Sequence, residues 1–174
     1  MFTDPVKNSK AFNLREDMIV ADLGAGTGSY TIPVAKLVPM GKVYVVEIQK
    51  DFLATVADKV KEEHLNNVEY IWGDIEKIGG TKLKDSILDA VVVSNVLFQI
   101  EDKNKFLEEI KRILKPGGRV FLIDWSDSSF VVSPNISKII SENNAREMFE
   151  DKGFIWERSI DAGKHHYGII FTKP

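Results

Sequence analysis

Three glycines at alternate positions follow an apolar run that ends in an acid, in the stretch Val20-Ala21-Asp22-Leu23-Gly24-Ala25-Gly26-Thr27-Gly28. This pattern predicts a buried strand, a turn whose backbone lies against a ligand, and then a helix. Glycine suits such a turn because a side chain there would block the ligand or would require a positive φ. The stretch therefore predicts a ligand site at Gly24, Ala25, Gly26 and Gly28.

The charge beside this loop indicates which kind of ligand it binds. The spacing G-x-G-x-G differs from the G-x-G-x-x-G of dinucleotide-binding loops, in which the start of the helix holds a pyrophosphate. Asp22 stands two residues before the first glycine, where its negative charge would repel a phosphate. The same charge suits an ammonium or sulfonium group. It favours S-adenosylmethionine as ligand over NAD, and an NAD-binding oxidoreductase is the less favoured alternative.

Further polar residues stand where the next predicted strands end. Glu47 lies nineteen residues after the last glycine, where an acid can accept hydrogen bonds from both hydroxyls of a ribose. Asp74 follows the third strand and is placed to accept from an adenine amino group, with Ile48 and Ile75 on the two faces of the base. Asn95 follows the fourth strand, where it would reach the amino-acid end of the ligand. A single Asp after a strand is often only a cap or a turn residue, but together these residues match one adenosyl ligand.

The elements that must position these residues alternate along the chain. Five apolar runs rich in Val and Ile lack period-2 polarity, which is typical of strands buried on both faces of a parallel sheet. They are Met18–Leu23, Lys42–Glu47, Val68–Trp72, Leu88–Ser94 and Arg119–Asp124. Helical patterns lie between them, at Tyr30–Val38, Lys50–His64 and Lys103–Leu114. The turn Lys115-Pro116-Gly117-Gly118 ends the last of these helices.

The C-terminal third predicts a helix and a hairpin. A polar loop, Ser126–Ser133, precedes a helix from Pro134 to Lys152. Two strands, Phe154–Ile160 and His165–Thr172, then follow around a short turn that contains a glycine, which predicts an antiparallel pair. Residues 1–174 are therefore expected to form a single doubly wound α/β domain, with the ligand crevice at the carboxyl ends of the strands.

Together these motifs resemble those of the class I S-adenosylmethionine-dependent methyltransferases. Asp22-Leu23-Gly24-Ala25-Gly26-Thr27-Gly28 resembles the first motif of the family, Glu47 its ribose-binding acid, and Gly73-Asp74-Ile75 its adenine contact. Leu114-Lys115-Pro116-Gly117-Gly118 resembles the turn before its fifth strand. The resemblance covers roughly Met18 to the C-terminus and is strongest to small bacterial or archaeal members of the methyltransferase-11/UbiE-like group, which often lack an assigned substrate.

This resemblance implies a cofactor and a topology. The cofactor is S-adenosyl-L-methionine, which leaves as S-adenosyl-L-homocysteine. The fold is a three-layer α/β/α, Rossmann-like domain whose seven-stranded sheet has the order 3-2-1-4-5-7-6 with strand 7 antiparallel. The antiparallel strand agrees with the hairpin predicted above.

The acceptor of the methyl group is not named by these motifs. Ser94-Asn95-Val96-Leu97-Phe98-Gln99 stands where enzymes that methylate exocyclic base amines have Asp/Asn-Pro-Pro-Tyr, which disfavours a nucleic-acid substrate. Residues 1–17 are too few for a lid domain, so we expect the acceptor side to be open, or completed by a partner subunit or by the substrate. The acceptor-side candidates are Phe98, Gln99, Asp124, Trp125, His165, His166 and Tyr167. Because neighbours in a strand point to opposite faces, the two histidines are not expected to share a metal ion, and no metal site is predicted.

Composition limits the remaining classes of function. The 174 residues have 44% hydrophobic and 28% charged side chains and a net charge of −3, which is typical of a soluble domain without a nucleic-acid footprint. No signal peptide is expected from the sequence, which also lacks the run of about 20 apolar residues that a membrane span needs, so a cytoplasmic location is expected. The lack of cysteine excludes thiolate catalysis and cysteine-based zinc sites. We therefore predict a methyltransferase for a small-molecule acceptor, and a homodimer is among the assemblies that the sequence allows. The alternative is a non-catalytic adenosyl-binding module or partner subunit.

Overall fold

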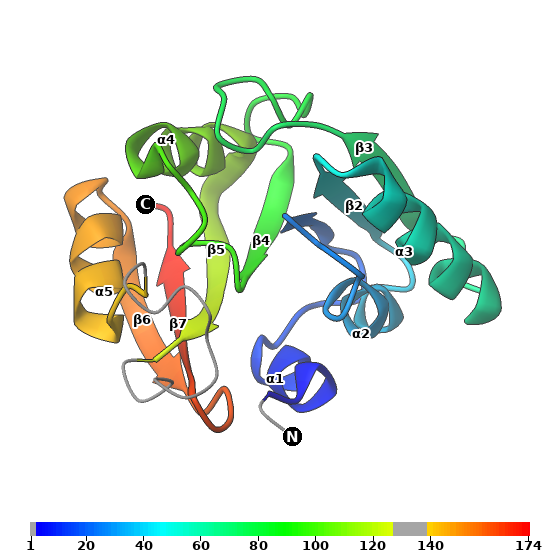
Figure 1. Cartoon of the computed structure of the whole chain (residues 1–174), viewed down its shortest axis with the longest axis horizontal. Coiled ribbons are helices and arrows are strands. Elements are labelled where there is room, and N and C mark those ends of the chain that lie inside the picture. Colours follow the sequence, from blue (N-terminus) through cyan, green and yellow to red (C-terminus); the bar gives the residue numbers. More distant parts are fainter. Residues whose placement is uncertain (1–2, 127–138) are drawn as a thin grey trace.

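A computed structural model describes residues 3–126 and 139–174 of the chain. The described strands form one seven-stranded sheet in the order β3-β2-β1-β4-β5-β7-β6 (Figure 1). The strands are β1 (Ile19–Leu23), β2 (Lys42–Glu47), β3 (Val68–Trp72), β4 (Leu88–Ser94), β5 (Leu114–Trp125), β6 (Ile155–Ile160) and β7 (His166–Thr172). The helices are α1 (Pro5–Ala11), α2 (Thr31–Leu37), α3 (Lys50–Glu62), α4 (Lys103–Ile113) and α5 (Glu142–Asp151). None of these described helices is both long and apolar enough to cross a membrane.

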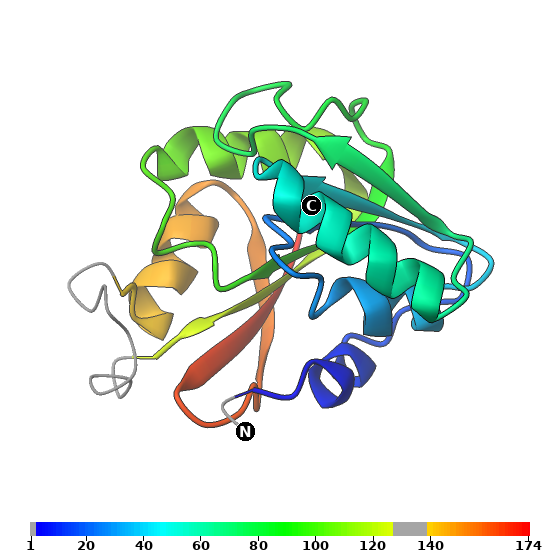
Figure 2. The ribbon, with the colours of Figure 1, turned by 45° about the vertical axis from the view of Figure 1, so that its right-hand side comes forward.

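Helices cover both faces of the sheet, and each face has its own apolar core (Figure 2). Alternate residues of a strand point to opposite faces, and β5 illustrates this division. Phe121 and Ile123 belong to the core beneath α2 and α3, whereas Val120 and Leu122 belong to the core beneath α4 and α5. Burial on both faces explains why the central strands are continuously apolar.

The order of the strands reverses at β1. This strand pairs in parallel with β2 on one side and with β4 on the other. The chain runs outward from β1 to β3 and then returns to the opposite side of β1 to form β4. In open parallel sheets, ligands bind at such a reversal, beyond the carboxyl ends of the strands. The predicted sheet order is confirmed, as is the antiparallel β7, which pairs with both β5 and β6.

Two strands differ from the sequence predictions. The prediction that every strand is buried on both faces is wrong for β3, where Glu69, Tyr70 and Trp72 are exposed, because β3 forms an edge of the sheet. The segment Lys115–Gly118 was predicted as a turn before the fifth strand, yet β5 already begins at Leu114. Leu114 pairs with β4, and the segment then bulges out before the pairing resumes.

The C-terminal elements also begin later than predicted. Helix α5 starts after Ser141, whose hydroxyl accepts a hydrogen bond from the backbone N–H of Asn144, 3.2 Å away. Residues 139–141 are not helical, so the predicted helix is wrong there, and its first part, residues 134–138, lies outside the described residues. The predicted loop is described only at Ser126. His165 lies in the turn with φ +67°, and β7 starts one residue later.

The N-terminal segment contains a helix that the sequence analysis did not predict. Asp4 caps α1 by accepting from the backbone N–H of Lys7 at 3.0 Å, and Pro5 occupies its first turn. Phe12, at the end of α1, is fully buried and stacks on Phe121 with 4.2 Å between the ring centroids. Residues before β1 therefore contribute to the core beneath α2.

Candidate functional site

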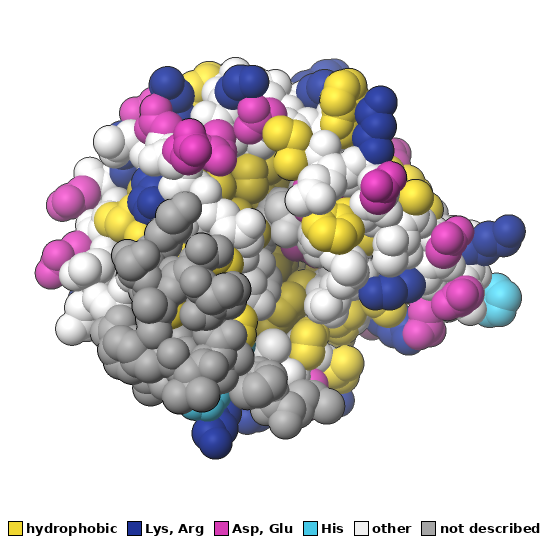
Figure 3. All heavy atoms as spheres, viewed as in Figure 1, with side chains coloured by type: hydrophobic (Ala, Val, Ile, Leu, Met, Phe, Trp, Pro, Cys, Tyr) yellow, Lys and Arg dark blue, Asp and Glu magenta, His cyan; other side chains and the backbone are white. Residues whose placement is uncertain are grey.

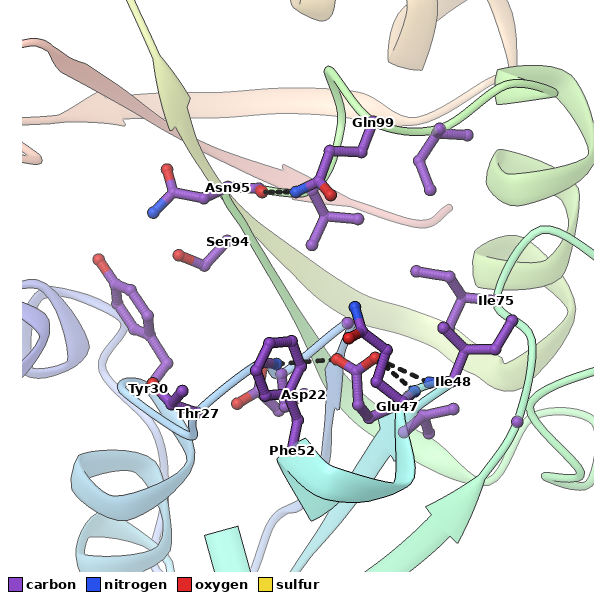
Figure 4. Close-up of a pocket in the computed structure, with 18 of the residues that line it drawn as sticks. Asp22, Thr27, Tyr30, Glu47, Ile48, Phe52, Ile75, Ser94, Asn95 and Gln99 are labelled. Atoms are coloured by element: carbon purple, nitrogen blue, oxygen red, sulfur yellow. Dashed lines mark hydrogen bonds between the residues drawn. The ribbon is translucent and has the colours of Figure 1, made fainter. Parts of the chain in front are cut away.

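A cavity of about 340 Å³ opens at the carboxyl ends of β1, β2 and β4 and beside the loop after β3 (Figure 4). In the view of Figure 3, the molecule is hollowed near its centre, with hydrophobic side chains in the depth of the hollow. All the ligand residues predicted from the sequence except Gly28 line the cavity. These are Asp22, Gly24, Ala25, Gly26, Glu47, Ile48, Asp74, Ile75 and Asn95.

The glycines of the loop serve two different purposes. Gly24 has φ +68°, and a Cβ on it would lie 2.7 Å from Cγ2 of Val96. Gly28 has φ +78°, and a Cβ there would lie 2.9 Å from Cγ2 of Val56 in α3. Both positions exclude a side chain by conformation and by contact. Gly24 lets the loop after β4 approach the cavity, whereas Gly28 lets α3 pack against the loop without itself lining the cavity.

Glu47 connects the glycine loop to the loop after β2. Its Oε2 accepts from the backbone N–H of Gly26 at 2.9 Å, and its Oε1 accepts from those of Ile48 at 2.8 Å and Gln49 at 3.0 Å. A carboxylate has about four acceptor positions, so these three bonds leave about one for a ligand. The sequence predicts hydrogen bonds from two ribose hydroxyls to Glu47, whereas the geometry favours one such bond to a carboxylate that is already oriented.

The electrostatic character of the cavity is acidic. Four carboxylates line it, and no lysine, arginine or histidine stands among its described lining residues; the acids are Asp22, Glu47, Asp74 and Glu76. Asp22 is 2% exposed and accepts from the hydroxyl of Thr31 at 2.6 Å. Burial raises the pKa of Asp22 to about 6, and the nearby charge of Glu47 contributes. Such a cavity suits a cationic ligand and disfavours a pyrophosphate, as in NAD.

One end of the cavity is apolar. Ile48 and Ile75 lie on the same side of it in Figure 4. The carbonyl of Ile48 accepts from the indole N–H of Trp72 at 2.9 Å. Asp74 lies nearby and accepts from the backbone N–H of Glu76 at 3.0 Å. The ammonium of Lys77, 2.9 Å away, holds the pKa of Asp74 below its usual range. This end therefore offers two apolar side chains beside an ionised acid.

The opposite end is polar and contains residues that the sequence analysis missed. Tyr30, Ser94 and Asn95 gather there (Figure 4). Asn95 has φ +56°, and its carbonyl accepts from Nε2 of Gln99 at 3.0 Å. Tyr30 stands two residues after the last glycine of the loop, and this closeness in sequence was the signal that could have placed it in the cavity lining. Phe52 was missed as well; it lies in the first turn of α3, just after the Glu47 loop.

The acceptor-side candidates are dispersed. Gln99 lines the cavity, whereas Phe98 lines a second cavity of about 470 Å³ beside α5. Trp125 and His166 stack with 4.3 Å between their ring centroids. Neither they nor His165, in the adjoining turn, line either of these cavities. Tyr167 is buried in the core beneath α5. Of this set, the structure brings only Gln99 to the cavity that holds the predicted ligand residues.

Asp124 connects β5 to the loop after β4. It is 2% exposed, and its Oδ2 accepts from the backbone N–H of Leu97 at 2.8 Å while its Oδ1 accepts from that of Trp125 at 2.8 Å. The Leu97 loop also carries Asn95 and Gln99. Asp124 is therefore placed to hold this wall of the cavity rather than to contact a ligand.

The pKa of Asp124 predicts a dependence of stability on pH. Burial raises this pKa to about 6, although the N–H groups of Trp125 and Leu97 oppose the shift. In the unfolded chain the carboxyl of Asp124 loses its proton near pH 3.8, whereas in the folded protein it keeps that proton up to about pH 6. The free energy of unfolding of the wild type therefore falls as pH rises from 3.8 to about 6. Asp124→Asn has no carboxyl to titrate at this position. The difference in unfolding free energy between this variant and the wild type should therefore shift in favour of the variant by up to about 3 kcal/mol from pH 4 to pH 7.

Urea unfolding at the two pH values measures this gain. Asp58→Asn, at an exposed position of α3, is the matched control and should show a constant difference from the wild type. A constant difference for Asp124→Asn would contradict the prediction.

Comparison with known proteins assigns the family. A family model described as a methyltransferase domain matches residues 14–171, which is most of the chain. The chain belongs to the class I S-adenosylmethionine-dependent methyltransferases. A demethylmenaquinone methyltransferase of a Geobacillus species is 32% identical over 191 residues, covering 92% of this chain and 79% of the relative. A ubiquinone/menaquinone biosynthesis C-methyltransferase UbiE of Hydrogenovibrio crunogenus is 30% identical over 146 residues, and the chain spans 56% of the length of that relative.

Solved structures agree with this assignment. The crystal structure of an S-adenosylmethionine-dependent methyltransferase from Aquifex aeolicus superimposes with a TM-score of 0.90 at 31% identity, covering 99% of this methyltransferase and 91% of that chain. A Sulfolobus solfataricus protein described as a type 11 methyltransferase has a TM-score of 0.79 at 25% identity, with 100% and 95% covered. S-adenosylmethionine is accordingly the cofactor of this methyltransferase. The acidic cavity fits its sulfonium and ammonium groups, and the buried Oδ1 of Asn95, which has no hydrogen-bond partner among the described residues, offers a further acceptor.

Proposed function

We propose that this methyltransferase binds S-adenosylmethionine in the 340 Å³ cavity and transfers its methyl group to a small-molecule acceptor. The adenine lies between Ile48 and Ile75 with its amino group toward Asp74, the ribose lies on Glu47, and the amino-acid end lies near Asn95. The observation that carries this arrangement is the acidic lining beside the glycine loop, since four carboxylates and no lysine, arginine or histidine are among the described lining residues.

The catalytic task of the protein is then mainly one of placement. S-adenosylmethionine supplies a methyl group that is already activated by its sulfonium. Much of the rate enhancement available to the chain comes from holding the acceptor in line with that methyl group. Glu47, held by three backbone N–H groups, and the loop held by Asp124 give the cavity walls that such placement requires.

An aromatic ring carbon is the acceptor class that we propose to test first. The Geobacillus and Hydrogenovibrio relatives are named for methylation in menaquinone and ubiquinone synthesis. Gln99 and Ile100 line both the donor cavity and the second cavity, whose other lining residues include Phe98, Ile140 and Met148. The lining of this second cavity also includes Glu101, Lys103 and Asn144. Its apolar side chains offer a surface for a reduced quinone ring, and its polar side chains offer partners for the ring hydroxyls.

Calorimetry with S-adenosylhomocysteine tests the donor half of this proposal. The wild type should bind it, and Asp74→Ala should weaken binding about 10-fold through the loss of one hydrogen bond to a charged group. Asp58→Ala, exposed on α3, is the matched control and should bind as the wild type does. No binding by the wild type would contradict the proposal, and unchanged affinity in Asp74→Ala would contradict the placement of the adenine.

Turnover tests the acceptor half. Transfer of a labelled methyl group from S-adenosylmethionine is measured with a reduced demethylmenaquinone analogue, a catechol, an amine and a carboxylic acid. Methylated product from the quinol alone supports an aromatic ring carbon as the acceptor. Product from one of the other three compounds contradicts it and identifies that compound's class as the acceptor instead. Binding of the donor without turnover on any of them would favour a non-catalytic module or a partner subunit.

A further inference from the structure

S-adenosylmethionine brings a negative charge into an acidic cavity, if the protein binds this donor there as the proposed function states; the present inference rests on that proposal. S-adenosylmethionine carries two cationic groups, which the carboxylates of the cavity suit, and one carboxylate of its own. Proteins often bind carboxylates through arginine, yet no arginine, lysine or histidine is among the described lining residues. Among the residues that the structure describes, neutral hydrogen-bond donors are therefore the candidates to bind the carboxylate of the donor.

Neutral donors gather at the polar end of the cavity, away from Ile48 and Ile75 (Figure 4). The hydroxyl of Tyr30 lies at the same end of the cavity as Ser94 and Asn95 in this view. Tyr30 is only 3% exposed, and Ser94, at the end of β4, is one of the polar groups that act on the pKa of Tyr30. Burial raises the pKa of Tyr30 above its usual value, so the phenol keeps its proton at neutral pH.

The bonds already made by Tyr30 decide which charge it accommodates. Its oxygen accepts from Nδ2 of Asn8 in α1 at 2.9 Å, so the capacity it retains is mainly that of a donor. The nearby Oγ1 of Thr3 is 3.3 Å away, longer than an ordinary O–H···O bond, and that hydroxyl donates to the carbonyl of Ala162 at 3.0 Å. A carboxylate oxygen is a stronger hydrogen-bond acceptor than a hydroxyl oxygen. The hydroxyl of Tyr30 would therefore donate its hydrogen bond to an anion in the cavity in preference to Thr3.

We propose that Tyr30 binds the carboxylate of S-adenosylmethionine and that Asn8 is its positioning residue. Nδ2 of Asn8 also contacts Oγ1 of Thr3 at 3.0 Å and the carbonyl of Ala162 at 3.1 Å. These contacts join α1 to the turn between β6 and β7 and leave the phenol little freedom to rotate away. The N-terminal helix thereby takes part in the recognition of the donor, and the site distinguishes ligands by their amino-acid end.

Removal of the phenol tests this assignment when two ligands are compared. S-adenosylhomocysteine has the carboxylate, whereas 5′-methylthioadenosine has the same adenosine and thioether without the amino-acid end. By calorimetry, Tyr30→Phe should bind S-adenosylhomocysteine about 10-fold more weakly, because a hydrogen bond to a charged group is lost. Its affinity for 5′-methylthioadenosine should stay unchanged. Tyr70→Phe, on the exposed edge strand, is the matched control and should change neither affinity.

The other outcomes separate the two proposals. An equal loss for both ligands would show that Tyr30 only supports the fold of the cavity, and no loss for either would show that it does not contact the carboxylate; each overturns the inference while the proposed function stands. No binding of either ligand by the wild type overturns both.

Asn8→Ala tests the positioning role separately. This variant should lose about 3-fold in affinity for S-adenosylhomocysteine and none for 5′-methylthioadenosine, as expected when a neutral hydrogen bond that orients the phenol is removed. Combined with Tyr30→Phe, it should cause no further loss, because both changes act on the same bond. Losses that add would overturn the positioning role. A thermal unfolding midpoint recorded for each variant confirms that the folded protein is being titrated.

Discussion

Glu47→Gln is expected to weaken the binding of S-adenosylhomocysteine about 100-fold, because about two charge-assisted hydrogen bonds worth roughly 1.5 kcal/mol each are lost. The carboxylate accepts from the backbone N–H groups of Gly26, Ile48 and Gln49. A glutamine amide must turn its NH₂ group toward at least one of these donors, so the glycine loop and the loop after β2 separate there. The ribose hydroxyl also loses a charged acceptor, so the binding surface and its ligand contact fail together.

Calorimetry with the folded variant measures this loss. Glu62→Gln, which removes an equal charge at an exposed position of α3, is the matched control and should bind as the wild type does. The thermal unfolding midpoint of Glu47→Gln should fall as well, because its loops are no longer joined. An affinity within about 3-fold of the wild type, a change of about 0.6 kcal/mol, would refute the assignment of Glu47 to the ribose.

Arg112→Ala is expected to lower the free energy of unfolding by about 3 kcal/mol, the order found when one partner of a buried ion pair is removed. Its partner Glu109 in α4 is fully buried. Arg112 donates to both oxygens of this carboxylate, from Nε at 2.8 Å and from Nη2 at 2.7 Å. Without the guanidinium, the charge of Glu109 keeps only the hydroxyl of Thr81 at 2.5 Å and backbone N–H groups, including that of Gly79 at 2.7 Å.

The pH dependence of this deficit follows from the pKa of Glu109. Burial raises that pKa, but Arg112, Thr81 and the Gly79 N–H together outweigh burial and lower it to about 2. A lowered carboxyl pKa stabilises the fold fully above the unfolded value of 4.5 and progressively less as pH falls toward 2. The difference between wild type and variant should therefore be largest near neutral pH and shrink below pH 4.5.

Urea unfolding near neutral pH and at about pH 4 measures both effects. Arg146→Ala, which removes an exposed ion pair with Glu150 within α5, is the control and should cost about 0.5 kcal/mol. A deficit for Arg112→Ala as small as that of the control would contradict the prediction. The ion pair also supports the donor cavity, because Glu109 holds Gly79 and Thr81. The carbonyl of Gly80, between them, accepts from the backbone N–H of Asp74 at 3.1 Å. Loosening of this loop should also weaken donor binding.

Much of the donor side was predictable because its determinants are local in the sequence. A strand, a turn with positive φ and a helix within about ten residues specify the glycine loop, and Gly24 and Gly26 do line the cavity with φ of +68° and +52°. Glu47 and Asp74 reach the same cavity because parallel strands present their carboxyl ends at one edge of the sheet. The sheet order followed from the family resemblance, and the hairpin from its short turn.

Other features depend on segments far apart in the chain. The apolar run of β3 reads like a buried strand, yet its place at the edge of the sheet exposes Tyr70 and Trp72. Trp125 ends β5 and His166 begins the antiparallel β7, so both lie at the edge of the sheet where the ligand residues lie, but they stack on each other instead of lining the cavity. A residue's position after a strand predicts the edge of the sheet on which it lies, but not which neighbour its side chain meets.

The sequence by itself determined the methyl donor of this protein, because the residues for that ligand belong to short strand–turn–helix units whose geometry is set by neighbouring residues. Tertiary structure alone decided how these residues are held. Three backbone N–H groups orient Glu47, and Asn8 and Ala162, which are 154 positions apart, meet beside Tyr30. Such contacts form only when the layers pack, since hydrogen bonds between distant segments leave no periodicity or spacing in the chain.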